Sequence, residues 1–243
     1  MFVTRIRLDT PPEPAWPFAI PAVRHIAEHG LTFERPVTFL VGENGSGKST
    51  VVEAIADVCG IGSDGGKAGT KYASTGMKTP LGEAVKPELT VDGLRLIGGP
   101  RRKRRGFFLR AETLFNLGRS VSGMHGFWET DLEQESHGEG FLTVFATMFR
   151  DPGLYLMDEP EAALSFASCL RLVALMHELG RSGGQVICAT HSPVLAATPG
   201  ADVVELGDHG CRRTAWTDLE LVDNWRRYLA DPDAYLHRLV DLE

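Results

Sequence analysis

The segment Gly42–Thr50 most constrains the fold of this chain, because it matches the pattern G-x-x-x-x-G-K-[S/T] in full. Glycines in this pattern let the backbone turn sharply and aim successive N–H groups at phosphate oxygens. A short apolar run, Val37–Val41, precedes the segment, and Lys48–Cys59 carries apolar residues at helical spacing. The pattern therefore predicts a phosphate-binding loop between a buried strand and a helix.

The side chains of this loop suit a nucleoside triphosphate bound together with its metal ion. Lys48 places a positive charge on the β- and γ-phosphates, and Ser49 offers a hydroxyl ligand to Mg²⁺. The helix that begins at the loop also points its positive dipole end at the phosphates. We expect ATP and Mg²⁺ as cofactors, and the candidate binding residues are Gly42, Asn44, Gly45, Ser46, Gly47, Lys48, Ser49 and Thr50.

Two further apolar runs predict parallel strands that end at the same edge of the sheet. Leu154–Met157 leads into Asp158 and Glu159, and Gln185–Thr190 leads into His191. Because ligands collect at the carboxyl ends of parallel strands, we expect Asp158 to hold Mg²⁺ and Glu159 to polarise the attacking water. We expect His191 to sense the γ-phosphate. A solvated acidic turn and a structural histidine are the plain alternatives.

The rest of the pattern favours a single α/β domain over residues 1–243, with an inserted lobe of loops and helices at about 60–150. Strands that alternate with helices predict a mostly parallel central sheet covered on both faces, preceded by N-terminal β elements. The other expected elements are strands at Phe2–Leu8 and Leu89–Ile97, helices at Glu139–Phe149, Glu161–Leu179 and Asp218–Leu239 (the last broken near Pro232), and a hairpin made of Ala201–Leu206 and Cys211–Trp216.

Charge and cysteine content exclude several classes of protein. The net charge of −7 gives no global positive field that would draw the chain to nucleic acid or to an anionic membrane. Four scattered cysteines without a C-x-x-C pair fit neither a disulfide framework nor a zinc site. The N-terminus is no signal peptide, and no apolar run approaches the length of a membrane span. We therefore expect a cytoplasmic protein with no membrane partner.

The run Arg101–Arg105 is a local exception to this acidic character. Five adjacent positive charges could grip the phosphate backbone of DNA, where each contact adds a salt-dependent increment. They could equally dock an acidic effector protein, or form a solvated loop in the inserted lobe. All three interpretations stay open at the level of the sequence.

Taken together, these motifs resemble those of ABC-type ATPases, in the order in which that family carries them. The resemblance covers nearly the whole chain and implies a P-loop NTPase fold of the ABC-ATPase type. It is closer to the head domains of chromosome-maintenance and recombination-repair ATPases than to transporters, and in particular to compact bacterial "AAA family" ATPases. The matching segments are Gly42–Thr50, Ser136–Gly140, Leu154–Glu159, Ala162–Ser165 and His191.

The resemblance assigns Ser136, Gly138 and Glu139 to the signature loop, which in this family meets the γ-phosphate bound by the opposite subunit. Ser136 can hydrogen-bond a phosphate, and Gly138 allows its backbone to approach closely. A helix that begins near Glu139 would point its N-terminal dipole at the anion, although S-x-G-E alone is equally typical of a helix cap. The resemblance thus implies a homodimer whose formation is linked to ATP binding.

This chain departs from the family in two places. Relatives usually carry a Mg²⁺-binding glutamine between the phosphate loop and the signature, but Gln134 lies too close to the signature to serve. Glu112 or Asn116 could substitute for it. Ser165 stands where many relatives have aspartate, which puts a cross-subunit role of that position in doubt.

An aromatic or arginine surface for the adenine is expected near the N-terminal strand. Trp16, Phe18 and Arg24 are the candidates, with core packing as the plainer role for any one of them.

Three functions compete on these grounds. The first is a cytosolic ATPase whose ATP-bound dimer does mechanical or switching work in a DNA-related or defence process. The second is a nucleotide-gated module that holds DNA or an effector protein and hydrolyses ATP slowly. The third is the nucleotide-binding subunit of a transporter, which the absence of a Leu-Ser-Gly-Gly-Gln sequence weakens.

Overall fold

The computed structural model describes residues 1–9, 15–61, 66–67, 78–98, 105–110 and 151–237. Most of the predicted lobe at about 60–150, including the helix expected at Glu139–Phe149, lies outside these residues. None of the described helices combines the length and the apolar character that crossing a lipid bilayer requires.

A larger sheet forms the centre of the molecule, with seven strands in the described ranges in the order β10-β9-β3-β8-β7-β6-β4. The inner strands from β9 to β6 run parallel, whereas β10 and β4 pair antiparallel at the two edges. The mostly parallel sheet expected from the sequence is therefore confirmed. The strands are β3 (Val37–Val41), β4 (Gly66–Lys67), β6 (Gly106–Arg110), β7 (Leu154–Asp158), β8 (Gln185–Thr190), β9 (Asp202–Gly207) and β10 (Gly210–Arg213).

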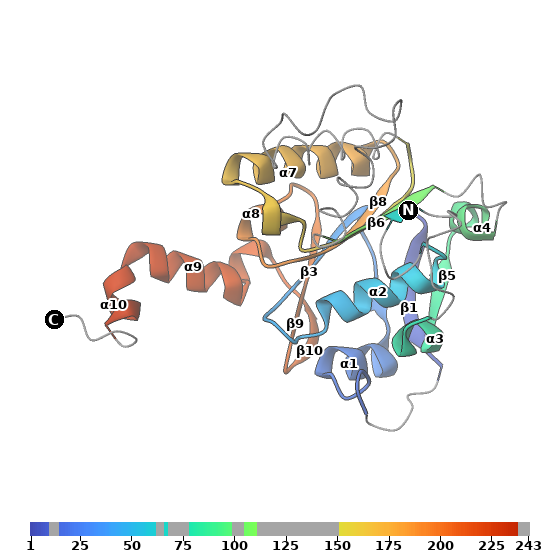
Figure 1. Cartoon of the computed structure of the whole chain (residues 1–243), viewed down its shortest axis with the longest axis horizontal. Helices are drawn as coiled ribbons and strands as arrows, with labels where there is room; N and C mark the ends of the chain where they lie inside the picture. Colours follow the sequence, from blue (N-terminus) through green and yellow to red (C-terminus); the bar gives the residue numbers. More distant parts are fainter. Residues whose placement is uncertain (10–14, 62–65, 68–77, 99–104, 111–150, 238–243) are drawn as a thin grey trace, which may run out of the picture.

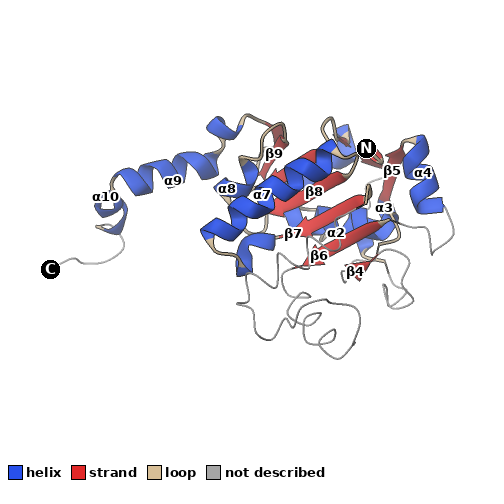
Figure 2. Cartoon of the chain, turned by 90° about the horizontal axis from the view of Figure 1, so that it is seen from above, coloured by secondary structure: helices blue, strands red, loops and turns tan. Residues whose placement is uncertain are grey.

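Helices cover both faces of this sheet (Figures 1 and 2). On one face lie α1 (Pro21–His29) and α2 (Lys48–Val58), and on the other lie α7 (Phe166–Arg181) and α8 (Pro193–Ala196). Successive residues of a strand enter opposite cores, so that Leu40 packs with α2 while Phe39 packs with α7. Burial on both faces explains why the inner strands are continuous apolar runs.

A smaller sheet at the N-terminus confirms the predicted β elements. In it, β1 (Val3–Leu8) pairs antiparallel with β2 (Leu31–Thr32) and with β5 (Val85–Leu89). The helices α3 (Pro80–Ala84) and α4 (Val91–Gly98) flank β5.

The strand predicted at Leu89–Ile97 is wrong, because β5 ends at Leu89 and α4 occupies the rest of the segment. Thr90 explains the switch: its Oγ1 accepts a hydrogen bond of 3.0 Å from Gly93 N, which satisfies a free donor at the start of a helix.

The helix predicted over Glu161–Leu179 begins later than expected, at Phe166. Pro160–Ala163 forms a separate 3₁₀ turn, η2, and Ser165 then caps α7 by accepting a hydrogen bond of 3.2 Å from Ser168 N. The cap at Ser165 marks the start of α7, which the apolar spacing alone did not indicate.

The C-terminal part follows the prediction with one correction. The hairpin of β9 and β10 is confirmed, but its second strand ends at Arg213, and Trp216–Asp218 forms a 3₁₀ turn, η3. Beyond it, α9 (Glu220–Ala230) and α10 (Pro232–Leu236) project from the body of the molecule (Figure 1), and the predicted break near Pro232 is present.

Gln185 joins the two sheets and gives a test of the fold. Its fully buried side chain accepts hydrogen bonds from Phe2 N and Val3 N at 2.7 and 2.9 Å and donates to Val3 O at 2.7 Å. Replacing it with leucine leaves these backbone groups buried without partners, so Gln185→Leu should lower the free energy of unfolding by roughly 3 kcal/mol. Urea unfolding measures this, with the exposed Asn224→Leu as control. Equal stability of the two variants would contradict this linking role.

Candidate nucleotide site

The loop between β3 and α2 takes a shape that needs its glycines. Gly45 and Gly47 have φ angles of 80° and 97°, a region that side chains with a Cβ rarely adopt. A Cβ at Gly42 would lie 2.2 Å from Leu206 O on the neighbouring strand β9. The predicted phosphate loop therefore has the backbone turn that its pattern requires.

Lys48 lies against the inside of this loop. Its Nζ donates hydrogen bonds to Gly42 O at 2.8 Å and Glu43 O at 3.0 Å, and its side chain is buried. Burial lowers the pKa of Lys48, while the carboxylates of Glu159 and Asp158 act in the opposite direction. The ammonium group is thus fixed beside the loop's backbone and close to two carboxylates.

Ser46 provides the test of whether a phosphate fits. Its Oγ is buried and has no hydrogen-bond partner in the part of the chain that the structure describes. A buried hydroxyl without a partner costs free energy, so this atom is suited to meet an oxygen from a bound ligand. The loop therefore fits a phosphate group.

The two predicted metal ligands meet although 109 residues separate them in the sequence. Ser49 Oγ donates a hydrogen bond of 2.8 Å to Asp158 Oδ1, at the point where β7 ends beside α2. Burial raises the pKa of Asp158, while the hydrogen bond from Ser49 and the charge of Arg110 lower it. Hydroxyl and carboxylate oxygens are the ligands that Mg²⁺ prefers, so the residues at this point fit that ion.

The two predicted catalytic residues also lie together. Glu159 Oε1 is 3.3 Å from His191 Nε2, and both side chains are partly exposed. Glu159 is the only non-glycine residue with a positive φ in the described ranges, at 49°, and its N–H donates to Ala189 O at 2.9 Å. Strained backbone of this kind collects at functional sites, where surrounding contacts hold it in place.

Glu161 is a residue of this site that the sequence did not single out. Its Oε1 accepts hydrogen bonds from Thr190 Oγ1 at 2.7 Å and from His191 N at 2.6 Å. Burial raises the pKa of Glu161, and the hydrogen bond from Thr190 acts in the opposite direction. This carboxylate ties the segment after Glu159 to the turn that carries His191. No sequence pattern marks it, because the contact joins positions 30 residues apart.

Replacing Glu161 with leucine should therefore loosen the turn at His191. The hydroxyl of Thr190 and the N–H of His191 would lose their acceptor, which should lower the free energy of unfolding by roughly 2 kcal/mol. Glu161→Gln keeps one acceptor oxygen and serves as the matched control, with a much smaller expected change. Chemical denaturation measures both variants, and a loss of equal size in the two would contradict this assignment.

Arg110 and Glu53 are also part of the site without having been predicted. Arg110 is the last residue of β6, and its register partner on β7 is Asp158. Its Nη2 lies 2.7 Å from Glu53 Oε1 on α2 and 3.8 Å from Asp158 Oδ2. A strand predicted at Gly106–Leu109 would have placed Arg110 at the same edge of the sheet as Asp158.

Several predicted residues lie outside the described ranges. They are Glu112, Asn116, Ser136, Gly138 and Glu139, together with Arg101 to Arg104 of the basic run. Their roles stay predictions, as does the substitute for the missing glutamine.

The adenine candidates differ in their surroundings. Phe18 packs against the core, which was the plainer of its two expected roles. Arg24 is exposed and Trp16 is 71% exposed, so the expected core packing is wrong for these two residues. Trp16 precedes α1 by a few residues, and a Cβ at Gly47 would lie 2.9 Å from Ile20 Cγ2. The segment that carries Trp16 therefore approaches the phosphate loop.

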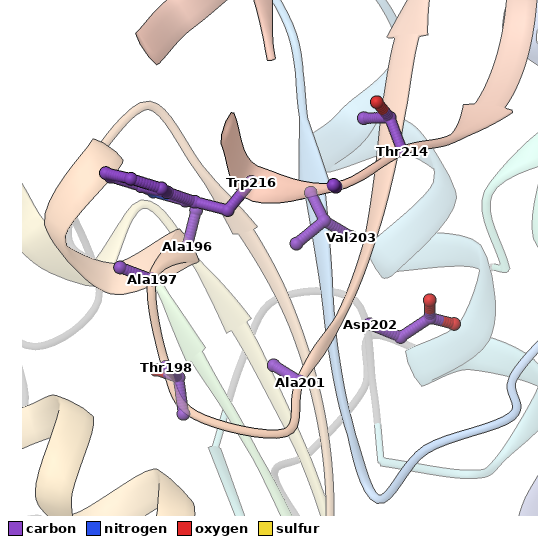
Figure 3. Close-up of a pocket in the computed structure, with 9 residues that line it drawn as sticks. Ala196, Ala197, Thr198, Ala201, Asp202, Val203, Thr214 and Trp216 are labelled. Carbon is purple, nitrogen blue, oxygen red and sulfur yellow. The ribbon is translucent and has the colours of Figure 1, made fainter. Parts of the chain in front are cut away.

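A separate cavity of about 390 Å³ lies between α8, the start of β9 and the segment after β10 (Figure 3). Asp202, which lines it, is at the amino end of β9, whereas the phosphate loop follows the carboxyl end of the neighbouring parallel strand β3. This cavity is therefore distinct from the site that the motifs assemble.

Two family models match separate parts of the chain. The model described as "AAA domain" matches residues 22–95, and the model described as "AAA domain, putative AbiEii toxin, Type IV TA system" matches residues 129–197. The first range contains the phosphate loop, and the second contains Asp158, Glu159 and His191. The two matches together therefore cover both halves of the assembled site.

Comparison with known proteins adds one relative and two structures. The zinc import ATP-binding protein ZnuC of Vibrio cholerae is 27% identical over 181 residues, 72% of this chain but only 64% of that protein's length. "An inward-facing conformation of a putative metal-chelate type ABC transporter" is 14% identical at a TM-score of 0.51, covering 94% of this chain and 89% of that chain. The SMC head domain from Thermotoga maritima is 17% identical at a TM-score of 0.44, and the match covers 76% of this chain and 92% of that chain. The first of these structures shows a shared fold.

Proposed function

Since the chain is an ABC-type AAA ATPase, we propose that it binds ATP together with Mg²⁺ and hydrolyses it. The observation that carries this proposal is the hydrogen bond of 2.8 Å between Ser49 and Asp158. The buried Ser46 hydroxyl of the same loop, which lacks a partner among the described residues, supports it. A phosphate-binding loop and a buried carboxylate meet there, as binding of a metal-bound triphosphate requires.

Different residues bind different parts of the ligand. Backbone N–H groups of the loop from Gly42 to Thr50 and the hydroxyl of Ser46 face the phosphates. Lys48 turns its ammonium group from the loop carbonyls to the β- and γ-phosphates, while Ser49 and Asp158 hold Mg²⁺. The metal ion neutralises charge on the phosphate oxygens when it is bound.

The residues that follow the carboxyl ends of β7 and β8 carry out the reaction. Glu159 accepts a proton from the water that attacks the γ-phosphorus, and ADP is the leaving group. His191 senses the γ-phosphate, held in place by the hydrogen bond of 2.6 Å from its N–H to Glu161. Trp16, which is 71% exposed, offers an aromatic face to the adenine.

We further propose that the site is completed by a second copy of the chain. Ser136, Gly138 and Glu139 would meet the γ-phosphate held by the opposite subunit, so that ATP links two copies into a dimer. Such a nucleotide-dependent dimer could act in the cytoplasm on DNA or on an effector protein. Residues 1–243 form one ATPase domain in this proposal, with an inserted lobe at about 60–150.

A transporter subunit is the second candidate, because ZnuC is an import ATP-binding protein by its name. The absence of a Leu-Ser-Gly-Gly-Gln sequence in this chain weighs against it. Purification of the Glu159→Gln protein with ATP from its source cells separates the candidates. A membrane-spanning partner in the purified complex would favour the transporter, and DNA or a cytosolic effector would favour the first proposal.

Thermal unfolding with and without nucleotide tests the proposed binding. A ligand at a hundred times its dissociation constant stabilises the native state by about 2.7 kcal/mol. ATP with Mg²⁺ should therefore raise the melting temperature by several degrees, and EDTA should remove most of that gain. No shift at millimolar ATP-Mg²⁺ would contradict the proposal.

A further inference from the structure

Arg110 bridges two elements that carry the metal-binding residues. It ends β6, beside Asp158 on β7, and it reaches across to Glu53 on α2. Glu53 lies one helical turn after Ser49, so both face the same side of α2. The guanidinium carbon also lies 5.9 Å from the centroid of the Phe108 ring, within the range of a cation–π interaction.

The two oxygens of Asp158 have different partners. Oδ1 accepts the hydrogen bond from Ser49 at 2.8 Å, and Oδ2 faces Arg110 at 3.8 Å. Only 9% of the Asp158 side chain and 26% of the Arg110 side chain are exposed, so water screens this pair weakly. A metal ion at Ser49 and Asp158 would therefore enter the field of a guanidinium that is always charged.

Carboxylates outnumber the cations around this point. Glu159, Asp158 and Glu161 act on Lys48, and Glu53 pairs with Arg110 at 2.7 Å. The two cations therefore offset part of the attraction that the carboxylates exert on a metal ion. A nucleoside triphosphate changes this balance because it occupies Lys48 and brings several negative charges of its own.

We propose that Arg110 is the resident counter-cation of the metal site and weakens the binding of Mg²⁺ in the absence of nucleotide. The guanidinium neutralises Asp158 while no metal is bound, and Glu53 holds it in reach of that carboxylate. This inference rests on the proposed ATP site, and it assigns a positioning role to two residues outside the recognised motifs.

Binding of Mn²⁺, used as a visible substitute for Mg²⁺, tests this role without any measurement of turnover. Electron paramagnetic resonance counts free Mn²⁺ during a titration of nucleotide-free protein. Arg110→Met should bind Mn²⁺ at least about tenfold more tightly than the wild type, because one repelling unit charge has been removed. Arg110→Lys keeps the charge and should stay close to the wild type, as should Arg105→Met, which precedes the first residue of β6.

A second substitution checks that Glu53 acts through Arg110. Adding Glu53→Gln to Arg110→Met should leave the Mn²⁺ affinity close to that of Arg110→Met alone, because no guanidinium remains for Glu53 to hold. A further change as large as that caused by Arg110→Met would contradict a role of Glu53 through Arg110. Circular dichroism melts confirm that each variant is folded.

The same titrations with ATP present separate the role of Arg110 from the proposed ATP binding on which it rests. Equal nucleotide-free affinities for wild type and Arg110→Met, with ATP-dependent binding preserved in both, would overturn the role of Arg110 alone. Absence of Mn²⁺ binding to the wild type even with ATP would overturn the nucleotide site and this inference with it.

Discussion

Replacing Glu159 with glutamine should reduce ATP turnover by roughly 10²- to 10⁴-fold, the usual contribution of a general base. Glutamine has the same shape but cannot accept the proton of the attacking water. The side chain of Glu159 is 41% exposed, so this change should leave packing intact. Phosphate release at saturating ATP-Mg²⁺ measures turnover, and a separate titration should show that nucleotide affinity is preserved.

The same variant tests the composite site. Because ATP would be bound but not consumed, Glu159→Gln should accumulate an ATP-dependent dimer that light scattering detects as a doubled mass. The exposed Glu178→Gln on α7 is the matched control and should behave as the wild type. Undiminished turnover in Glu159→Gln would contradict the catalytic role of Glu159. If the variant stays a monomer at saturating ATP-Mg²⁺, the proposal of a site shared between two subunits is wrong.

Replacing Lys48 with methionine should weaken ATP binding by about tenfold to a hundredfold, since a hydrogen bond to a charged group contributes about 1.5–3 kcal/mol. Methionine keeps the aliphatic length of the side chain but loses the ammonium group that now bridges Gly42 O and Glu43 O. Calorimetric titration with ATP-Mg²⁺ measures the change in affinity.

Lys86 on β5 supplies the matched control for this experiment, because its side chain is exposed and lies on the smaller sheet. Lys86→Met should bind ATP as the wild type does. If Lys48→Met retained full affinity, the phosphate loop would not be the place where the nucleotide binds.

The central strands and the phosphate loop could be predicted from the sequence because each leaves a local signature. Burial on both faces turns β3, β7 and β8 into uninterrupted apolar runs, and the observed strands match the predicted ones to within one residue. The residues that follow these strands were then placed at one edge by the geometry of parallel sheets. Ser49 and Asp158 meet there, and Glu159 lies beside His191.

Contacts that depend on tertiary structure could not be predicted in this way. Arg110 reaches Asp158 only because β6 pairs with β7 in one particular register, and Glu161 reaches His191 across two loops. The strand expected at Leu89–Ile97 failed for a local reason, the capping side chain of Thr90, which apolar spacing does not reveal. Side chains that bridge elements thus account for most of what the sequence missed.

Release of phosphate from ATP by the purified wild-type chain tests the proposed ATPase activity most directly. We expect steady turnover that requires Mg²⁺, stops with EDTA and is absent from Lys48→Met purified in parallel, which excludes a contaminating ATPase. Turnover by the wild type that does not exceed that of Lys48→Met would contradict the proposed activity.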